Sequence, residues 1–186
     1  MVFKEETLSS ERVYEGKIIN VRKDKVTTVS GTSYREIVEH PEAVVMLALK
    51  PDGKVIMEKQ FRKPVEGVVF ELPAGKIDEG EKPEAAAARE LREESGYRAD
   101  SIRYLTKLYT SVGFTDEVIY AYLCTGLTPG EPDLDEHEAI DIEEYDIGAL
   151  LNMVMSGEIT DAKTQVAVLM VSRMIERGEL GEYLEK

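Results

Sequence analysis

Three glutamates stand close together near the end of a short predicted helix. Glu90 and Glu94 are four residues apart, and Glu90 and Glu93 are three apart, so their side chains cover neighbouring parts of one helix surface. Carboxylates at the C-terminal end of a helix oppose its dipole and destabilise it. Hard divalent cations such as Mg²⁺ bind carboxylate oxygens together with substrate phosphates. The spacing therefore indicates a metal site, with a solvated acidic surface as the alternative.

Bound divalent cations would allow hydrolysis at phosphorus, because they can activate a water molecule and stabilise the attacking and leaving oxygens. Arg89 directly precedes Glu90 and carries a permanent charge, so it could orient a neighbouring carboxylate through two hydrogen bonds. Glu81 and Glu93 could either bind a cation or support the groups that do.

The segment that contains these carboxylates resembles the Nudix box. Its pattern is Gly75, five residues, Glu81, seven residues, Arg89-Glu90-Leu91, one residue, Glu93-Glu94, one residue and Gly96. The position after the last glycine is usually aliphatic in the box and is Tyr97 here. Because Tyr97 follows the end of the helix, we expect this departure to affect packing alone.

The resemblance implies a cofactor and a set of ligands. The cofactor would be Mg²⁺, with Mn²⁺ as a substitute. The metal ligands would be Glu90, Glu94 and the backbone carbonyl of Ala74, while Arg89 and Glu93 would take part in catalysis. The alternative for Ala74 is an ordinary tight turn between a strand and a loop.

Motifs outside the box narrow the resemblance to the ADP-ribose pyrophosphatase branch of the family. They occupy residues 35–41, 60–64, 71–76, 111–117 and 157–164. The branch implies an α+β fold, an α/β/α sandwich with a mixed sheet and a small N-terminal region of antiparallel strands. It also implies a homodimer, in which residues 1–40 help to form the substrate pocket of the partner and residues 41–186 form the hydrolase domain.

The same resemblance implies residues that contact the substrate. Arg35 and Glu36 would lie near it, Arg62 would meet its diphosphate, and Gly113 and Phe114 would belong to the same pocket. The planar guanidinium group of arginine matches phosphate oxygens in geometry. The alternative for each arginine is a surface ion pair of small energetic effect.

Two positions differ from the branch pattern. Val112 stands where the branch commonly has a proline that accompanies a preference for ADP-ribose, and Glu42 replaces a common glycine. Both positions lie outside the predicted metal site. Val112 keeps open a related substrate, namely another nucleotide sugar such as GDP-mannose.

A late acidic loop supplies the expected catalytic base. The segment 135–140 matches, in position and character, a loop that carries such a glutamate in this branch. Glu136 is the predicted base and Glu138 an additional metal ligand, with Glu93 as the competing base. The alternative is a solvated acidic loop without a catalytic role.

The net charge and the cysteine count indicate which binding partners and which cellular compartment to expect. Lys and Arg total 23 and Asp and Glu total 37, giving a net charge of −14 that disfavours binding to nucleic acid. Cys124 is the single cysteine, which favours a reducing compartment such as the cytoplasm. We also expect no signal peptide and no membrane span, because no long apolar run occurs.

Hydrophobic patterns and turn residues predict the elements that position these side chains. Two or three antiparallel strands are expected over residues 11–39, with a turn at Ser30-Gly31, and a hairpin is expected from strands 43–49 and 55–60. Further strands are expected at 68–72, 102–110, 117–124 and 140–145, and a loop at 74–82. Helices are expected from Pro83 to Gly96, after Asp146 and after Asp161.

These observations favour Mg²⁺-dependent hydrolysis of ADP-ribose to AMP and ribose 5-phosphate. Hydrolysis of another nucleotide sugar, such as GDP-mannose, is the alternative within the same class. A non-catalytic nucleotide sensor is the alternative from another class, and the intact box argues against it.

Overall fold

The computed structural model describes residues 2–134, 136 and 138–184, which form two compact units. Unit 1 is drawn from residues 1–42 and 109–118, and unit 2 from residues 43–108 and 119–186. Asp135 and His137 of the predicted acidic loop lie outside the described residues.

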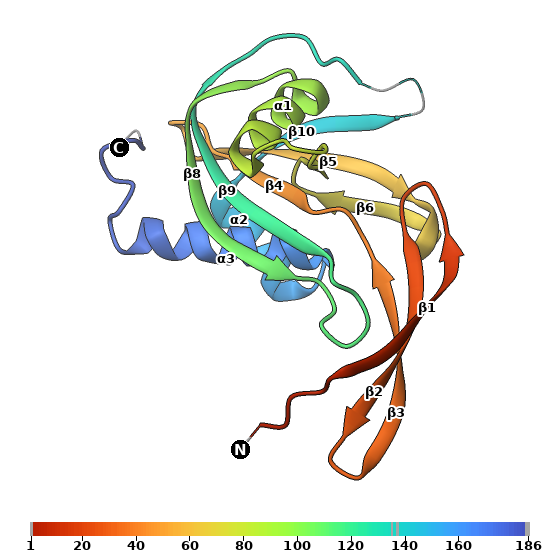
Figure 1. Ribbon diagram of the computed structural model, residues 1–186. Helices are drawn as coiled ribbons and strands as arrows, with labels where there is room; N and C mark the ends of the chain where they lie inside the picture. Colours follow the sequence, from red (N-terminus) through yellow and green to blue (C-terminus); the bar gives the residue numbers. More distant parts are fainter. Residues whose placement is uncertain (1, 135, 137, 185–186) are drawn as a thin grey trace. The chain divides into compact units, whose positions relative to one another are not determined.

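Unit 1 is a three-stranded antiparallel sheet with one appended loop (Figure 1). Its strands are β1 (Thr7–Glu15), β2 (Asn20–Thr28) and β3 (Gly31–Glu39), in the order β1-β2-β3. Gly31 has a φ of 135°, a conformation that suits glycine at the turn between β2 and β3. The predicted antiparallel strands and their turn at Ser30-Gly31 are confirmed.

Unit 2 contains two short sheets. One has the order β10-β5-β6, formed by β10 (Ile140–Asp146), β5 (Lys54–Arg62) and β6 (Gly67–Glu71). The other has the order β7-β4-β9-β8, formed by β7 (Ala74–Lys76), β4 (Ala43–Ala48), β9 (Val118–Thr128) and β8 (Arg98–Tyr109). Since β4 is antiparallel to β7 and parallel to β9, this sheet is mixed, as predicted.

Three helices complete the described part of unit 2, and their ends follow local sequence signals. They are α1 (Pro83–Ser95), α2 (Ile147–Ser156) and α3 (Ala162–Glu176), and a short 3₁₀ turn, η1 (Lys63–Val65), links β5 and β6. α1 starts at a proline and ends before Gly96. Gly96 has a φ of 77°, the left-handed conformation that commonly terminates helices. The Asp146 and Asp161 side chains accept backbone N–H groups at the starts of α2 and α3. All three predicted helices are confirmed.

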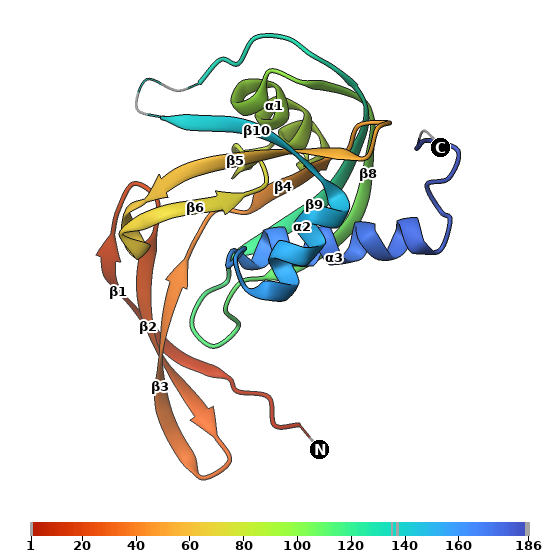
Figure 2. The same ribbon diagram turned by 180° about the vertical axis from the view of Figure 1, so that it is seen from behind.

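The strand β4 forms the centre of the core because both of its faces are covered. Val44, Met46 and Ala48 belong to a buried cluster with Ala86, Ala87 and Leu91 of α1. Val45 and Leu47 point to the opposite face and pack with residues of α2 and α3. Figures 1 and 2 show α1 on one side of the strands and α2 and α3 on the other. The predicted α/β/α sandwich is confirmed.

Two local predictions were wrong. The strands at 43–49 and 55–60 are joined by the predicted turn but do not form a hairpin, because β7 and β9 occupy the two edges of β4 while β5 pairs with β6 and β10. A single bridge, Leu49 to Val55, joins them. The predicted loop at 74–82 begins with a strand, β7, since residues 74–76 find a pairing edge on β4 that their sequence does not reveal.

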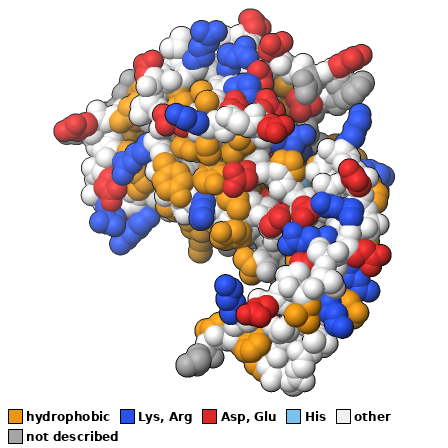
Figure 3. Space-filling view, in the orientation of Figure 1, with side chains coloured by type: hydrophobic (Ala, Val, Ile, Leu, Met, Phe, Trp, Pro, Cys, Tyr) orange, Lys and Arg blue, Asp and Glu red, His pale blue; other side chains and the backbone are white. Residues whose placement is uncertain are grey.

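The surface of unit 2 carries one apolar area on the face shown in Figure 3. Hydrophobic side chains gather there over β8 and β9, where Tyr104 is 52% exposed and stacks edge-on against Tyr122. Charged side chains of both signs surround this area. None of the helices in the described part of the chain is long and apolar enough to cross a membrane.

Candidate active site

The carboxylates of the predicted metal site lie on the inner face of α1. Glu90 and Glu94 follow the buried residues Ala87 and Leu91 by three positions each, so they share the helix face that packs on the strands. As a result Glu94 is 7% exposed, whereas carboxylates are rarely so buried without a partner.

Arg89 holds the outer carboxylates in place. Its Nε and Nη2 atoms donate to the two oxygens of Glu81 at 3.0 and 2.8 Å. Its Nη1 atom donates to Glu90 at 2.8 Å and to Glu93 at 3.1 Å. Arg92 also donates to Glu93, at 2.6 Å. Arg89 therefore orients three carboxylates of the motif, as predicted for its guanidinium group.

The backbone of β7 approaches α1 closely at two residues. The Ala74 N–H donates to Oε2 of Glu94 at 2.9 Å. A Cβ atom placed on Gly75 would lie 2.0 Å from Cδ of Glu90, so only glycine leaves room for that carboxylate. The structure thus brings Ala74, Glu90 and Glu94 close together, while binding of a metal by the Ala74 carbonyl stays a prediction.

Sequence reasoning missed one buried carboxylate, Glu58 on β5. Glu58 is 1% exposed and follows three fully buried apolar residues, Val55, Ile56 and Met57. Alternation along the strand puts Glu58 on the same face as Ile56, which packs against α1. A carboxylate at an inward position of an apolar strand is the signal that could have revealed it.

Glu71 lies directly opposite Glu58 in the register of β5 and β6, and it is 2% exposed. Two cations neutralise Glu71. The Nε atom of Arg62 donates to it at 2.6 Å, and the ammonium group of Lys163 pairs with its other oxygen. Lys163 also contacts Asp161 at 3.0 Å. Arg62, predicted to meet a diphosphate, is thus bound to a buried carboxylate next to the α1 site.

Burial raises the pKa values of the inner carboxylates. The pKa of Glu94 is about 9, because of burial and of the charges on Glu58 and Glu90. The pKa of Glu58 is about 8, because of burial and of the charge on Glu71. Burial also raises the pKa of Glu90, although Arg89 acts in the opposite direction. The protein alone therefore leaves negative charge at this place poorly compensated.

The donor chemistry of this cluster fits a divalent cation. Glu58 has an oxygen, Oε1, that is buried and has no hydrogen-bond partner among the described residues. Within those residues no group of three or more carboxylate, histidine or cysteine side chains is already arranged around one point. Mg²⁺ commonly uses one or two carboxylates and completes its shell with water and substrate phosphates, so pairs of carboxylates suffice.

The late acidic loop contributes one charge to this cluster. Glu138 raises the pKa values of Glu58, Glu90 and Glu94, so its carboxylate lies within electrostatic reach of all three. Glu136 is exposed in a turn. The remaining predicted substrate residues, Arg35, Glu36, Gly113 and Phe114, all belong to unit 1.

Within unit 1 these predicted substrate residues lie on β3 and on the loop 110–117. Arg35 forms an ion pair with Glu5 and donates to the carbonyl of Tyr34 at 2.9 Å. The carbonyl of Phe114 accepts the N–H of Val38 at 2.8 Å, which attaches the loop to β3. Phe114 is 54% exposed and Val112 is 81% exposed, so both side chains are available for contact.

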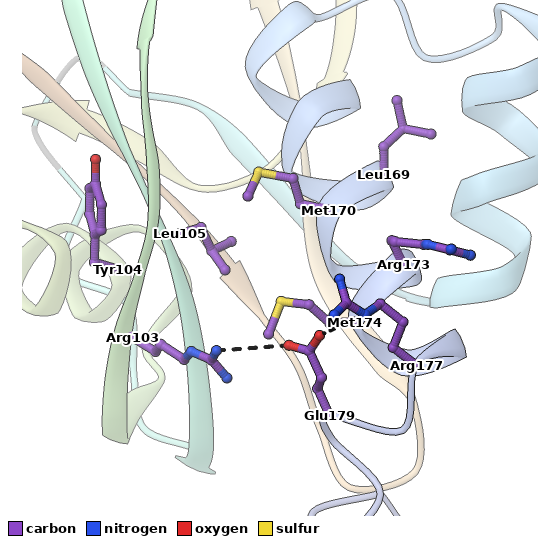
Figure 4. A pocket seen from close by; sticks show the side chains of 9 residues that line it. All are labelled: Arg103, Tyr104, Leu105, Leu169, Met170, Arg173, Met174, Arg177 and Glu179. Carbon is purple, nitrogen blue, oxygen red and sulfur yellow. Dashed lines mark ion pairs between the residues drawn. The ribbon is translucent and has the colours of Figure 1, made fainter.

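A pocket of about 490 Å³ lies at another place in unit 2 (Figure 4). β8 contributes Arg103, Tyr104 and Leu105, and the other lining residues come from α3 and the segment that follows it. Glu179 forms ion pairs with Arg103 at 4.0 Å and with Arg177 at 3.1 Å. None of the glutamates of α1 or β5 lines this pocket, so it is separate from the carboxylate cluster.

Two known domain families match consecutive parts of the sequence. The profile of the NUDIX domain matches residues 39–174, and that of the nucleoside diphosphate sugar hydrolase N-terminal domain matches residues 5–39. The chain is 44% identical over 167 residues to the ADP-ribose pyrophosphatase of Bacillus subtilis, covering 88% of this chain and 90% of that protein.

Two more distant proteins are also similar. The chain is 32% identical over 151 residues to the GDP-mannose pyrophosphatase of Yersinia pestis, covering 74% of this chain and 75% of that protein. A crystal structure described as an ADP compounds hydrolase superimposes with a TM-score of 0.85 at 22% identity. It covers 96% of this chain and 98% of its own, which shows that the two share a fold.

Proposed function

This chain belongs to the Nudix hydrolase family, and from that premise we propose that it hydrolyses the diphosphate linkage of ADP-ribose to AMP and ribose 5-phosphate. The observation that carries the proposal is the cluster of Glu90, Glu94 and Glu58, whose negative charge is only partly compensated by the protein. The 44% identity to an ADP-ribose pyrophosphatase over most of both chains supports the choice of substrate.

The cofactor in this proposal is Mg²⁺, with Mn²⁺ as a substitute. Glu90 and Glu94 would hold it, together with the carbonyl of Ala74 and with Glu138. When bound, such a cation neutralises the diphosphate and lowers the pKa of a coordinated water. Arg89 keeps the ligand Glu90 and the neighbouring Glu93 in fixed positions through its hydrogen bonds, so both carboxylates are oriented before substrate arrives.

The proposed base is Glu136, which would accept a proton from the attacking water. Its exposed position in a turn supports a group that approaches the substrate on binding. Glu93 is the competing candidate, but its two carboxylate oxygens already accept hydrogen bonds from Arg89 and Arg92, which hold it in place and occupy it. The pH profile of Glu136→Gln should separate the two, because loss of the true base removes the acidic limb.

Arg62 is proposed to meet the diphosphate. Its side chain is 41% exposed although it is bound to Glu71, so part of the guanidinium group remains available for a substrate oxygen. Arg35, Glu36, Gly113 and Phe114 of unit 1 are proposed to contact the rest of the substrate.

The region 1–40 is proposed to serve dimerisation and substrate contact, with residues 41–186 as the hydrolase domain. Every residue of β1 is exposed, and Leu8, Val13 and Tyr14 are 52%, 52% and 55% exposed. Exposed apolar side chains on an edge strand support packing against a second copy. The molar mass in solution by light scattering should be that of a dimer, and Val13→Asp should lower it. A buried free thiol, Cys124, is compatible with the proposed cytoplasmic location.

The substrate is tested with a panel assayed at equal concentration in Mg²⁺. ADP-ribose, GDP-mannose and ADP-glucose are ranked by kcat/KM, with AMP or GMP release followed by chromatography. We expect ADP-ribose to rank first. A first rank for GDP-mannose, favoured by Val112 and by the 32% identity to a GDP-mannose pyrophosphatase, would transfer the proposal to that substrate. Tight binding of ADP-ribose without cleavage would instead indicate a sensor.

A further inference from the structure

Glu58 stands in a place where an apolar residue would be expected. It is 1% exposed, and the three residues before it on β5 are fully buried and apolar. Its Oε1 atom has no hydrogen-bond partner among residues 2–134, 136 and 138–184. A buried carboxylate without a partner is costly, so a requirement other than packing must explain it.

The cations near Glu58 are bound elsewhere. Glu71, its direct partner across β5 and β6, takes the hydrogen bond of Arg62 and the ammonium group of Lys163. In the described part of the chain no ion pair of 4.0 Å or less involves Glu58 or Glu94. Two buried carboxylates therefore remain without a matching cation of the protein.

Glu58 and Glu94 face the same space. Glu58 shares the strand face of Ile56, and Ile56 belongs to the same buried cluster as Ala87 and Leu91 of α1. Glu94 lies one turn beyond Leu91 on the same helix face.

We infer that Glu58 is a further metal ligand of this enzyme, which binds a divalent cation together with Glu94. Glu90, bound by Arg89 and close to Gly75, lies one helical turn before Glu94 and belongs to the same proposed metal site. Two carboxylates are a usual protein contribution to a Mg²⁺ site, with water and substrate phosphate as the other ligands. The inference rests on the proposed function in that both require a divalent cation at this cluster.

The experiment measures metal binding rather than turnover. Mn²⁺ is titrated into the metal-free protein, and the free ion is followed by electron paramagnetic resonance to give the number of sites and their Kd. We expect Glu58→Gln to lose one site or to weaken it by about tenfold or more. Glu94→Gln should affect the same site. If Glu58→Gln binds Mn²⁺ at the same number of sites and with the same Kd as wild type, the inference is overturned.

A matched control removes one glutamate from the adjoining strand. Glu143 on β10 lies beside Met57 in the register and pairs with Lys59 at 2.7 Å, on the partly exposed surface. Glu143→Gln should bind Mn²⁺ as wild type does. If it loses the same site as Glu58→Gln, the effect comes from net charge and the inference fails.

A second variant and a second readout exclude a simple folding defect. Glu58→Val replaces the carboxylate with a residue that suits a buried strand, so it should fold and lose the same Mn²⁺ site. In chelator, both variants should have a higher Tm than wild type, and the rise in Tm on adding Mg²⁺ should be smaller. A Mg²⁺-induced rise equal to that of wild type in both variants would overturn the inference.

Failure of the inference and of the proposed function can be told apart. If wild type cleaves ADP-ribose and Glu58→Gln keeps every Mn²⁺ site, the proposed function is supported and Glu58 is not a metal ligand. If wild type cleaves no member of the substrate panel and Glu58→Gln loses an Mn²⁺ site, the proposed substrate class is wrong but Glu58 is a metal ligand.

Discussion

Two adjoining regions of unit 2 contain buried carboxylates, and they differ in how the charge is compensated. In the first region Glu71 is bound by Arg62 and Lys163, so the protein supplies its own cations. In the second region Glu58 of β5 faces α1, which carries Glu94, and neither carboxylate has an ion pair in the described part of the chain. In the first arrangement the buried charge is compensated within the protein, whereas in the second it stays uncompensated and costs stability unless a cation binds.

The difference teaches that burial of a glutamate is by itself a poor guide to its role. Glu58 and Glu71 are equally buried and lie opposite each other on neighbouring strands. Only the identity of the groups around them distinguishes a structural ion pair from a site that requires a ligand. Four changes would break or sharpen this contrast.

The largest effect is expected from Glu94→Gln in the second region. It removes a ligand charge but keeps the size of the side chain and the hydrogen bond from Ala74. Turnover of ADP-ribose in Mg²⁺ should fall about 100-fold or more, while circular dichroism shows an unchanged fold. If this variant turns over ADP-ribose as fast as wild type, Glu94 is not a metal ligand and the two regions do not differ as described.

A smaller loss of activity is expected from Gly75→Ala. The new Cβ would lie 2.0 Å from Cδ of Glu90, so the carboxylate must move away from its position. We expect kcat/KM to fall about tenfold or more, because misplacing a reacting group by about 1 Å can cost that much. Gly67→Ala is the matched control, since its Cβ would meet only the Val65 carbonyl at 3.6 Å. Equal effects of the two variants would contradict this explanation.

In the first region, Glu71→Gln should act on stability. It leaves Arg62 and Lys163 without their buried partner, but Arg62 is 41% exposed and remains partly solvated. Urea unfolding in chelator should therefore show a loss of about 2 kcal/mol, below the range for a fully buried pair. The exposed pair Lys63–Glu66 gives the control, Glu66→Gln, which should unfold as wild type does. A gain in stability for Glu71→Gln would mean that the two regions do not differ as described.

The smallest effect is expected in the pH dependence of the metal-free protein. The pKa values of Glu58 and Glu94 are raised from 4.5 to about 8 and about 9, so folding favours their protonated forms. Their contribution to stability is complete below about pH 4.5 and is lost as the pH rises through 8 and 9.

In chelator, the Tm of wild type should therefore decline between pH 5 and pH 9, and Glu58→Gln should reduce the decline. Glu39, Glu81, Glu143 and Glu144 have lowered pKa values, so their contributions change only below pH 4.5. Burial raises the pKa of Glu90, so Glu90 adds to the decline in both wild type and Glu58→Gln, and the difference between the two curves reports Glu58. A decline of equal size in the variant would contradict the assignment to Glu58.

The sequence by itself determined the elements whose signals are local. Pro83 and Gly96 mark the ends of α1 to the residue, and Asp146 and Asp161 mark the starts of α2 and α3, because caps and glycine stops depend on neighbouring residues. The spacing of Glu90, Glu93 and Glu94 on one helix likewise follows from the helical period alone.

Tertiary structure alone decided which strands pair and which charges meet. β4 and β5 are consecutive and joined by a good turn, yet they lie in different sheets because β7 and β9 fill both edges of β4. Glu58 stands 36 positions before Glu94, and Lys163 stands 92 positions after Glu71. No local pattern links such residues, since burial and pairing depend on where the chain packs. For that reason the sequence indicated the metal-binding helix, while the fold decided which buried carboxylates have partners.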